Sequence, residues 1–118
     1  MATYKSGDPQ GALEAWMPLA RKGMAPAAYS VADLYYRGDG VERQLEESIR
    51  WFRVAADELF PPAMFHLGYL YVQGEGVDRD LAEAYRWMTR AAMLGESKAE
   101  EGVKLLESRM TPEQLEAA

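Results

Sequence analysis

Apolar residues in this chain recur at helical spacings, in short segments that glycines separate. Ala63, Leu67 and Leu70 fall at i, i+4 and i+7, which places them on one stripe of a helix. Residues 81–94 carry a second apolar stripe, with spacings of three, four and seven residues. Between the two stripes lie Gly74 and Gly76, and glycine readily adopts the left-handed conformation that ends a helix. The pattern therefore predicts a helical hairpin.

This hairpin occurs twice in the sequence. Residues 26–61 align with residues 62–97 without a gap, at an offset of 36 residues, and 14 aligned positions are identical. Unrelated segments of average composition would share about two. Partial copies occur at residues 12–23 and 99–107, in phase with the second and first halves of the unit. A repeat of this length is typical of solenoids, in which each unit buries its apolar face against its neighbours.

We therefore expect a single all-α repeat domain over residues 1–118. Its expected parts are a half repeat (8–25), two full repeats (26–61 and 62–97), and a half repeat with a capping tail (98–118).

Helix starts differ between the two copies. Asp80, with Glu83 three residues later, resembles a capping box at the start of a second helix. The first copy has Gln44 at the position of Asp80, so we expect its second helix to start more loosely. In the C-terminal tail, Thr111 is the expected N-cap, followed by Pro112 in the first turn and Gln114 at the third helical position.

The second copy resembles the Sel-one-like repeat, a subclass of the tetratricopeptide-like helical repeats. The matching residues are Ala63, Leu67, Gly68, Tyr71, Gly74, Gly76, Val77, Asp80, Ala84, Trp87, Ala91, Ala92 and Gly95. The first copy departs from the pattern at Val31, Ala32, Gln44, Ser48 and Leu59. The resemblance implies a right-handed α/α solenoid of helix-turn-helix repeats that acts as an adaptor in protein complexes.

Composition narrows the function classes further. The chain has 118 residues, a formal net charge of -6 and no long Lys/Arg run, which argues against a nucleic-acid or anionic-membrane surface. Cysteine is absent, so disulfides, cysteine-ligated metals and cysteine nucleophiles are excluded. No apolar run reaches the length of a membrane span, and we expect a soluble protein.

Localisation is left open between two compartments. Many relatives of the Sel-one-like type are bacterial and exported, so residues 4–8 could follow a trimmed export signal, which would place the protein in the bacterial periplasm. The alternative is the cytoplasm.

No constellation of residues predicts catalysis, a metal or a cofactor. His66 is the only histidine, so a histidine-based metal site or triad lacks its partners. The carboxylates Glu46, Glu47, Asp78 and Asp80 lie at expected helix starts, where the helix dipole favours anions. The glycine pairs at 38–41 and 74–77 are interpreted as turns, because no Lys follows at phosphate-loop spacing. We therefore predict that the protein is not an enzyme.

Two repeated positions are assigned to the framework. Trp51 and Trp87 are expected to pack in the core, because burying an indole removes a large apolar area from water. Ala32 and Gly68 are small residues that would let two helices approach closely.

The face that differs between the copies is the candidate binding surface. On each expected first helix, three residues share a flank beside the apolar stripe. They are Ser30, Asp33, Arg37 in the first copy and His66, Tyr69, Gln73 in the second. Arg37 lies one turn beyond Asp33, at the spacing of an i,i+4 ion pair. Because solenoids of this class line their concave face with first helices, we hypothesise that a protein or peptide binds in this groove.

A second interpretation stays open. The chain could be a structural piece of a longer solenoid, or could self-associate into a homo-oligomer, through apolar terminal helices. The apolar residues concerned are Leu13, Trp16, Met17 and Leu19 near the N-terminus, and Val103, Leu105 and Leu106 near the C-terminus.

Overall fold

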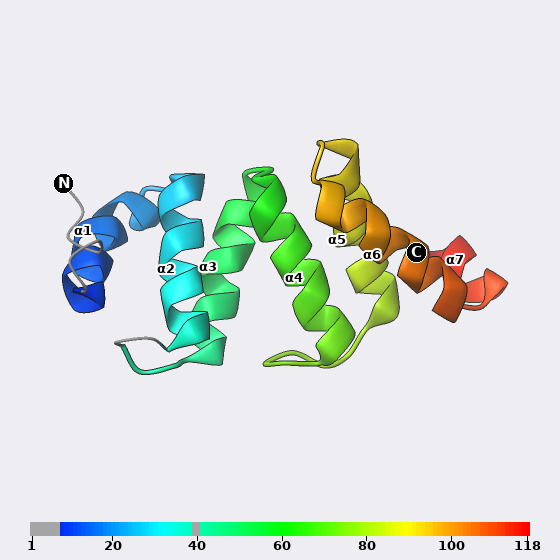
Figure 1. The fold of residues 1–118 in the computed structure, drawn as a ribbon, viewed down its shortest axis with the longest axis horizontal. Coiled ribbons are helices and arrows are strands. Elements are labelled where there is room, and N and C mark those ends of the chain that lie inside the picture. Colours follow the sequence, from blue (N-terminus) through cyan, green and yellow to red (C-terminus); the bar gives the residue numbers. More distant parts are fainter. Residues whose placement is uncertain (1–7, 39–40) are drawn as a thin grey trace. The chain divides into compact units, whose positions relative to one another are not determined.

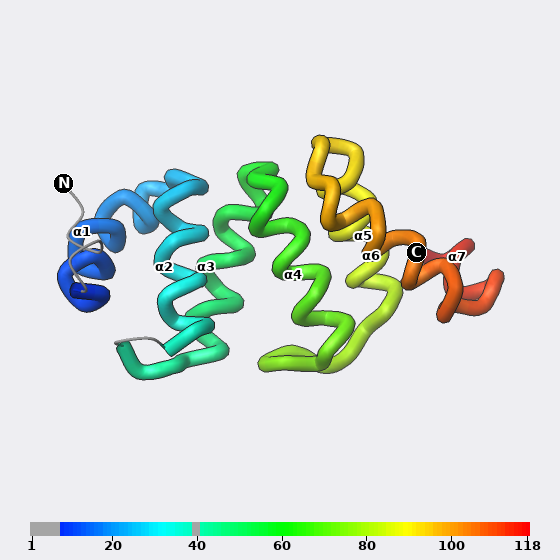
Figure 2. The backbone as a smooth tube through the Cα atoms, in the orientation of Figure 1, coloured from blue at the N-terminus to red at the C-terminus, as the bar shows by residue number. Residues whose placement is uncertain are grey.

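The computed structural model describes residues 8–38 and 41–118, and seven helices follow one another in that part of the chain (Figure 1). They are α1 (Pro9–Arg21), α2 (Ala25–Arg37), α3 (Leu45–Asp57), α4 (Pro61–Gln73), α5 (Leu81–Met93), α6 (Ser97–Arg109) and α7 (Pro112–Ala117). The backbone reverses direction between α2 and α3 and again between α4 and α5 (Figure 2). Both predicted helical hairpins are confirmed.

The helices form two compact units, residues 1–58 and 59–118. In the first unit, α2 packs against α1 on one side and against α3 on the other. In the second unit, α5 packs against both α4 and α6, and the short helix α7 also contacts α5. A middle helix therefore organises each unit.

The predicted apolar stripes form the cores of these units. Ala63, Leu67 and Leu70 are fully buried in the second unit, as the i, i+4, i+7 spacing predicts. Trp51 and Trp87 are only 8% and 7% exposed, which confirms both as framework residues.

The predicted caps hold the helix starts. Asp80 accepts a hydrogen bond from the backbone N–H of Glu83 at 3.1 Å. Thr111 and Gln114 form a reciprocal capping box at α7. The Gln44 side chain makes no such bond within the described chain, yet α3 begins at Leu45, the residue equivalent to Leu81 of α5. The looser start of α3 stays a prediction.

An arginine and a glycine close the loop of each hairpin in the same way. Arg43 Nε donates to the Tyr36 carbonyl at 2.7 Å, and the equivalent Arg79 Nε donates to the Val72 carbonyl at 3.2 Å. Gly38 ends α2 with φ of 65°, and a Cβ there would lie 2.6 Å from Arg43 Cβ. The glycine is therefore needed both for its left-handed backbone and for space. Residues 39 and 40 of the first predicted turn lie outside the described residues.

The predicted close helix approach is also confirmed. In the first unit, the buried Ser48 hydroxyl of α3 donates to the Ala32 carbonyl of α2 at 2.9 Å. In the second unit, a Cβ on Gly68 would lie 3.2 Å from the Ala84 carbonyl oxygen and 2.9 Å from Met88 Cγ. Small residues at this crossing let the paired helices meet at backbone distance.

Candidate interaction surface

In the first unit, the predicted surface residues lie along α2. Ser30 and Asp33 are half-buried and Arg37 is exposed. Arg37 Nη2 forms an ion pair with Asp33 Oδ2 at 3.0 Å, as the i,i+4 spacing predicts. The pair fixes the direction of the guanidinium along the helix.

In the second unit, the predicted residues lie along α4 but divide between two environments. Tyr69 is 39% exposed, and both Tyr69 and Gln73 line a groove of about 600 Å³. His66 is half-buried and does not line this groove; its ring meets the Tyr69 ring edge-on, with centroids 6.4 Å apart. The structure therefore brings Tyr69 and Gln73 together at one concave surface, while His66 supports the Tyr69 ring.

The groove, called here the α4–α6 groove, is lined by three helices. One wall is α4, with Phe65, Tyr69, Val72 and Gln73. The other wall is α6, with Lys98, Glu101, Gly102, Leu105, Leu106 and Arg109, and Met88 of α5 also contributes. Gly102 and Leu105 occupy the same repeat positions as His66 and Tyr69, so the third copy contributes to this surface as well.

Two glycines make room for Met88 beneath the groove. A Cβ on Gly68 of α4 would lie 2.9 Å from Met88 Cγ, and a Cβ on Gly102 of α6 would lie 2.7 Å from Met88 Sδ. The Met88 side chain therefore lies against both flanking helices. Because a thioether side chain is flexible and polarisable, it forms an adaptable floor for apolar groups.

A side-chain hydrogen bond, called here the Tyr85–Glu107 clamp, links α6 to α5 outside the groove lining. The Tyr85 hydroxyl of α5 donates to Glu107 Oε2 of α6 at 2.9 Å. This hydrogen bond raises the pKa of Tyr85, because losing the proton would destroy the bond and place two negative charges side by side. The clamp helps to position the α6 wall.

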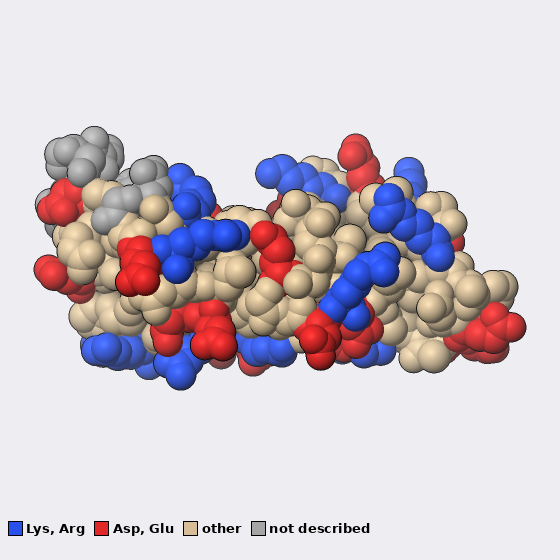
Figure 3. Space-filling view, turned by 90° about the horizontal axis from the view of Figure 1, so that it is seen from below, with Lys and Arg blue, Asp and Glu red and all other residues tan. Residues whose placement is uncertain are grey.

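Charged side chains edge the groove without neutralising one another. Within the described part of the chain, Lys98, Glu101 and Arg109 of α6 form no ion pair. All three side chains are exposed. On the face shown in Figure 3, basic and acidic side chains are interspersed.

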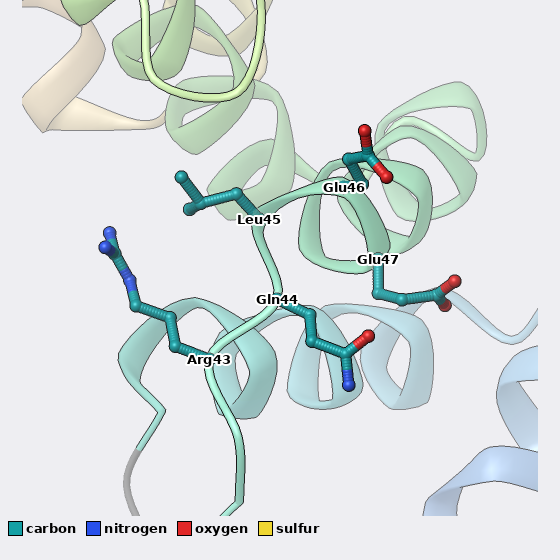
Figure 4. A pocket seen from close by; sticks show the side chains of 5 residues that line it. All are labelled: Arg43, Gln44, Leu45, Glu46 and Glu47. Carbon is teal, nitrogen blue, oxygen red and sulfur yellow. The ribbon is translucent and has the colours of Figure 1, made fainter.

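Another depression, of about 450 Å³, lies at the start of α3 and is lined by Arg43, Gln44, Leu45, Glu46 and Glu47. These five residues are consecutive, and their side chains fan outward so that their polar groups do not converge (Figure 4). Arg43 is already engaged with the Tyr36 carbonyl, and Glu46 and Glu47 lie in the first turn of α3, where carboxylates are stabilised by the helix.

Among residues 8–38 and 41–118, no group of three or more His, Asp or Glu side chains is placed to hold a metal ion. None of the helices in the described part of the chain combines the length and apolar character that a membrane crossing needs.

Comparison with known proteins identifies the repeats. The Sel1 repeat model matches residues 25–58 and 61–96. A comparison with curated proteins found no match. Among solved structures, the chain is similar to a Sel1 repeat protein from Oxalobacter formigenes, with a TM-score of 0.79 and 37% identity, over 83% of this chain and 40% of that one. It is also similar to a protective antigen of uropathogenic Escherichia coli strains that displays an SLR fold, with a TM-score of 0.87 and 28% identity, over 90% of this chain and 23% of that one.

These matches agree with the fold described above. The chain spans less than half the length of either solved relative. The predicted all-α solenoid fold class and the resemblance noted from the sequence are both confirmed. The chain belongs to the Sel1 repeat family.

Proposed function

We propose that this protein is a non-enzymatic adaptor that binds a protein or peptide partner through the open face of its first helices. Sel1 repeats generally serve as protein-interaction scaffolds. The supporting observation is that this face changes between copies while the framework repeats. At equivalent positions, α2 carries Asp33 and Arg37, whereas α4 carries Tyr69 and Gln73. A scaffold that presents different side chains on the same frame can recognise a specific sequence.

Tyr69 is the residue on which we expect affinity to depend most. It is exposed beside Leu105, and tyrosine offers a large contact area at low rotamer cost. Arg37 is expected to contribute through its guanidinium edge, while Asp33 holds it in place. Ser30 completes the proposed surface of the first unit, and His66 and Gln73 complete that of the second.

Site-specific photo-crosslinking tests this proposal. A benzophenone amino acid at position 69 should capture a partner from a lysate, and the same group at position 50, on α3, should not. With the captured partner purified, Tyr69→Ala and Arg37→Ala should each weaken binding by about 1–2 kcal/mol, with melting unchanged. Arg50→Ala and Arg86→Ala are the matched controls, because both lie on second helices in pairs with Glu47 and Glu83. Loss of binding in these controls alone would place the partner on the second helices and reject the proposal.

The alternative function is a structural piece of a longer solenoid, or a self-associating copy. Exposed apolar side chains on α1 and α6, Leu19 and Leu105, favour it. Sedimentation velocity over a hundredfold concentration range separates the two. A concentration-independent monomer supports the adaptor, whereas a dimer abolished by Leu19→Ser or Leu105→Ser supports self-association.

A further inference from the structure

We infer that the α4–α6 groove binds an extended peptide segment of another protein that places a large apolar side chain between two carboxylates. This inference rests on the proposed function and names the chemistry of the partner at the second unit. It follows from the shape of the groove, from its apolar middle, and from the two cations at its edges.

The middle of the groove is apolar and open. Tyr69 and Val72 of α4 face the groove opposite Leu105 of α6, which is 50% exposed. Gly102 adds no side chain to the α6 wall, and the nearly buried Met88 side chain fills the space beside it and lines the bottom of the groove. An aliphatic or aromatic side chain that enters here removes apolar surface from water on both walls and meets a floor that can adjust to its shape.

Lys98 and Arg109 set the spacing of the two carboxylates. They lie on the same face of α6, eleven residues apart, which corresponds to about 16 Å along a helix axis. An extended chain covers that distance in about five residues. Because only alternate side chains share one side of an extended chain, the two carboxylates are expected at an even spacing of four positions, with the apolar side chain midway between them and the long Lys98 and Arg109 side chains covering the remaining distance.

Of the two cations, Lys98 gives the stronger indication that the partner is acidic. It lies in the first turn of α6, where the helix dipole disfavours a cation, and it pairs with no anion among the described residues. Arg109 lies in the last turn, where the dipole favours it, so its place on α6 has a second explanation. Glu101 lies one turn from Lys98 and would oppose a carboxylate there.

An extended segment suits the groove better than a helix. A helix would need about eleven residues to span the distance between the two cations, whereas an extended chain needs about five. In an extended segment, alternate side chains point to the same side, so the anchor and a flanking residue can both face the walls.

The test uses the full chain and three synthetic ten-residue peptides in 150 mM salt, where the net charge of the chain is screened beyond about 8 Å but close pairs are not. The first peptide carries a central leucine and two glutamates four positions apart, each two residues from the leucine, so that all three face the same side of an extended chain. In the second, both glutamates are glutamine, and in the third, the leucine is serine. Binding is measured by fluorescence anisotropy and mapped by amide chemical shifts in ¹⁵N-labelled protein.

The first peptide should bind about fivefold more tightly than the glutamine peptide, the ratio expected for two exposed charge pairs. The ratio should fall to about one in the Lys98→Gln/Arg109→Gln variant. It should persist in Lys22→Gln/Lys104→Gln, which removes the same charge outside the groove. Glu101→Gln should strengthen binding of the acidic peptide about twofold. The serine peptide should bind at least fivefold more weakly to every variant.

The outcomes separate this inference from the proposed function. If the amide chemical shifts of Tyr69 and Leu105 change but glutamate peptides are not preferred, the acidic chemistry of the partner is rejected and the adaptor function stands. Shifts confined to α3 and α5 would overturn both. A dimer that Leu105→Ser abolishes would show that a second copy occupies the groove. Absence of binding to all three peptides would also reject the inference, while the crosslinking experiment would still judge the adaptor function.

Discussion

Leu59 allows a direct measurement of backbone strain in this fold. It has φ of 62°, in the left-handed region that L-residues disfavour, whereas the equivalent turns carry Gly23 at 85° and Gly95 at 96°. The left-handed conformation costs an L-residue roughly 1–2 kcal/mol. Replacing Leu59 by glycine removes that cost, but the more flexible unfolded chain returns about 0.5–1 kcal/mol. The Leu59 side chain is 62% exposed, so it loses little packing. Leu59→Gly should therefore raise the free energy of unfolding by about 0.5–1 kcal/mol.

Two matched variants isolate the backbone term. Leu59→Ala keeps the Cβ and the strain but removes the side-chain contacts, so it should be neutral or slightly destabilising. Gly95→Ala introduces the same strain at an equivalent turn, where a Cβ would meet no described atom within 4 Å, and should cost about 1 kcal/mol. Urea unfolding, followed by circular dichroism, measures all three. If Leu59→Gly is no more stable than Leu59→Ala, side-chain contacts rather than backbone strain govern this turn, and the reasoning is refuted.

Three further perturbations test the framework and the surface. Trp87→Ala should lower the free energy of unfolding by about 3–5 kcal/mol, because it opens a cavity at a side chain that is almost fully buried. If urea unfolding shows that the free energy falls by less than about 1 kcal/mol, this packing is contradicted. The raised pKa of Tyr85 means that the Tyr85–Glu107 bond stabilises the folded state below the ordinary tyrosine pKa of 10.0. That contribution should disappear as pH rises through the higher folded pKa of Tyr85, so wild type should lose stability relative to Tyr85→Phe above pH 10. Parallel curves of unfolding free energy against pH for the two proteins would argue against the bond. His66→Ala should lower stability by about 1 kcal/mol, because the half-buried ring loses an edge contact with Tyr69. Zinc should leave the melting temperature of wild type unchanged, and a zinc-dependent rise that is lost in the variant would reveal a metal site.

Much of the repeat architecture could be predicted because its causes are local in sequence. The capping bond of Asp80 spans three residues, the Asp33–Arg37 pair spans one helical turn, and Gly38 ends a helix through its own backbone angle. Such features depend on neighbours a few residues away. The 36-residue period then shows that the same local solutions recur.

The candidate surface could be predicted only in part. The flank of α4 was identified from helical periodicity, and Tyr69 and Gln73 do line a groove. The 36-residue offset also places Gly102 and Leu105 at the equivalent positions of the last copy. Periodicity could not separate His66 from Tyr69, because the two lie on the same flank and differ only in how neighbouring helices surround them.

What the sequence determined by itself is the repeat: its period, its helices, its caps and its buried stripe, all set by hydrogen bonds and spacings within one hairpin. What only the tertiary structure decided is which exposed residues meet. Tyr69 and Lys98 are 29 residues apart, and they line one groove because α4 and α6 both pack against α5, with Gly68 and Gly102 admitting Met88. That arrangement depends on helix packing over a long sequence separation, where a missing Cβ on two different helices sets how close they come to a third.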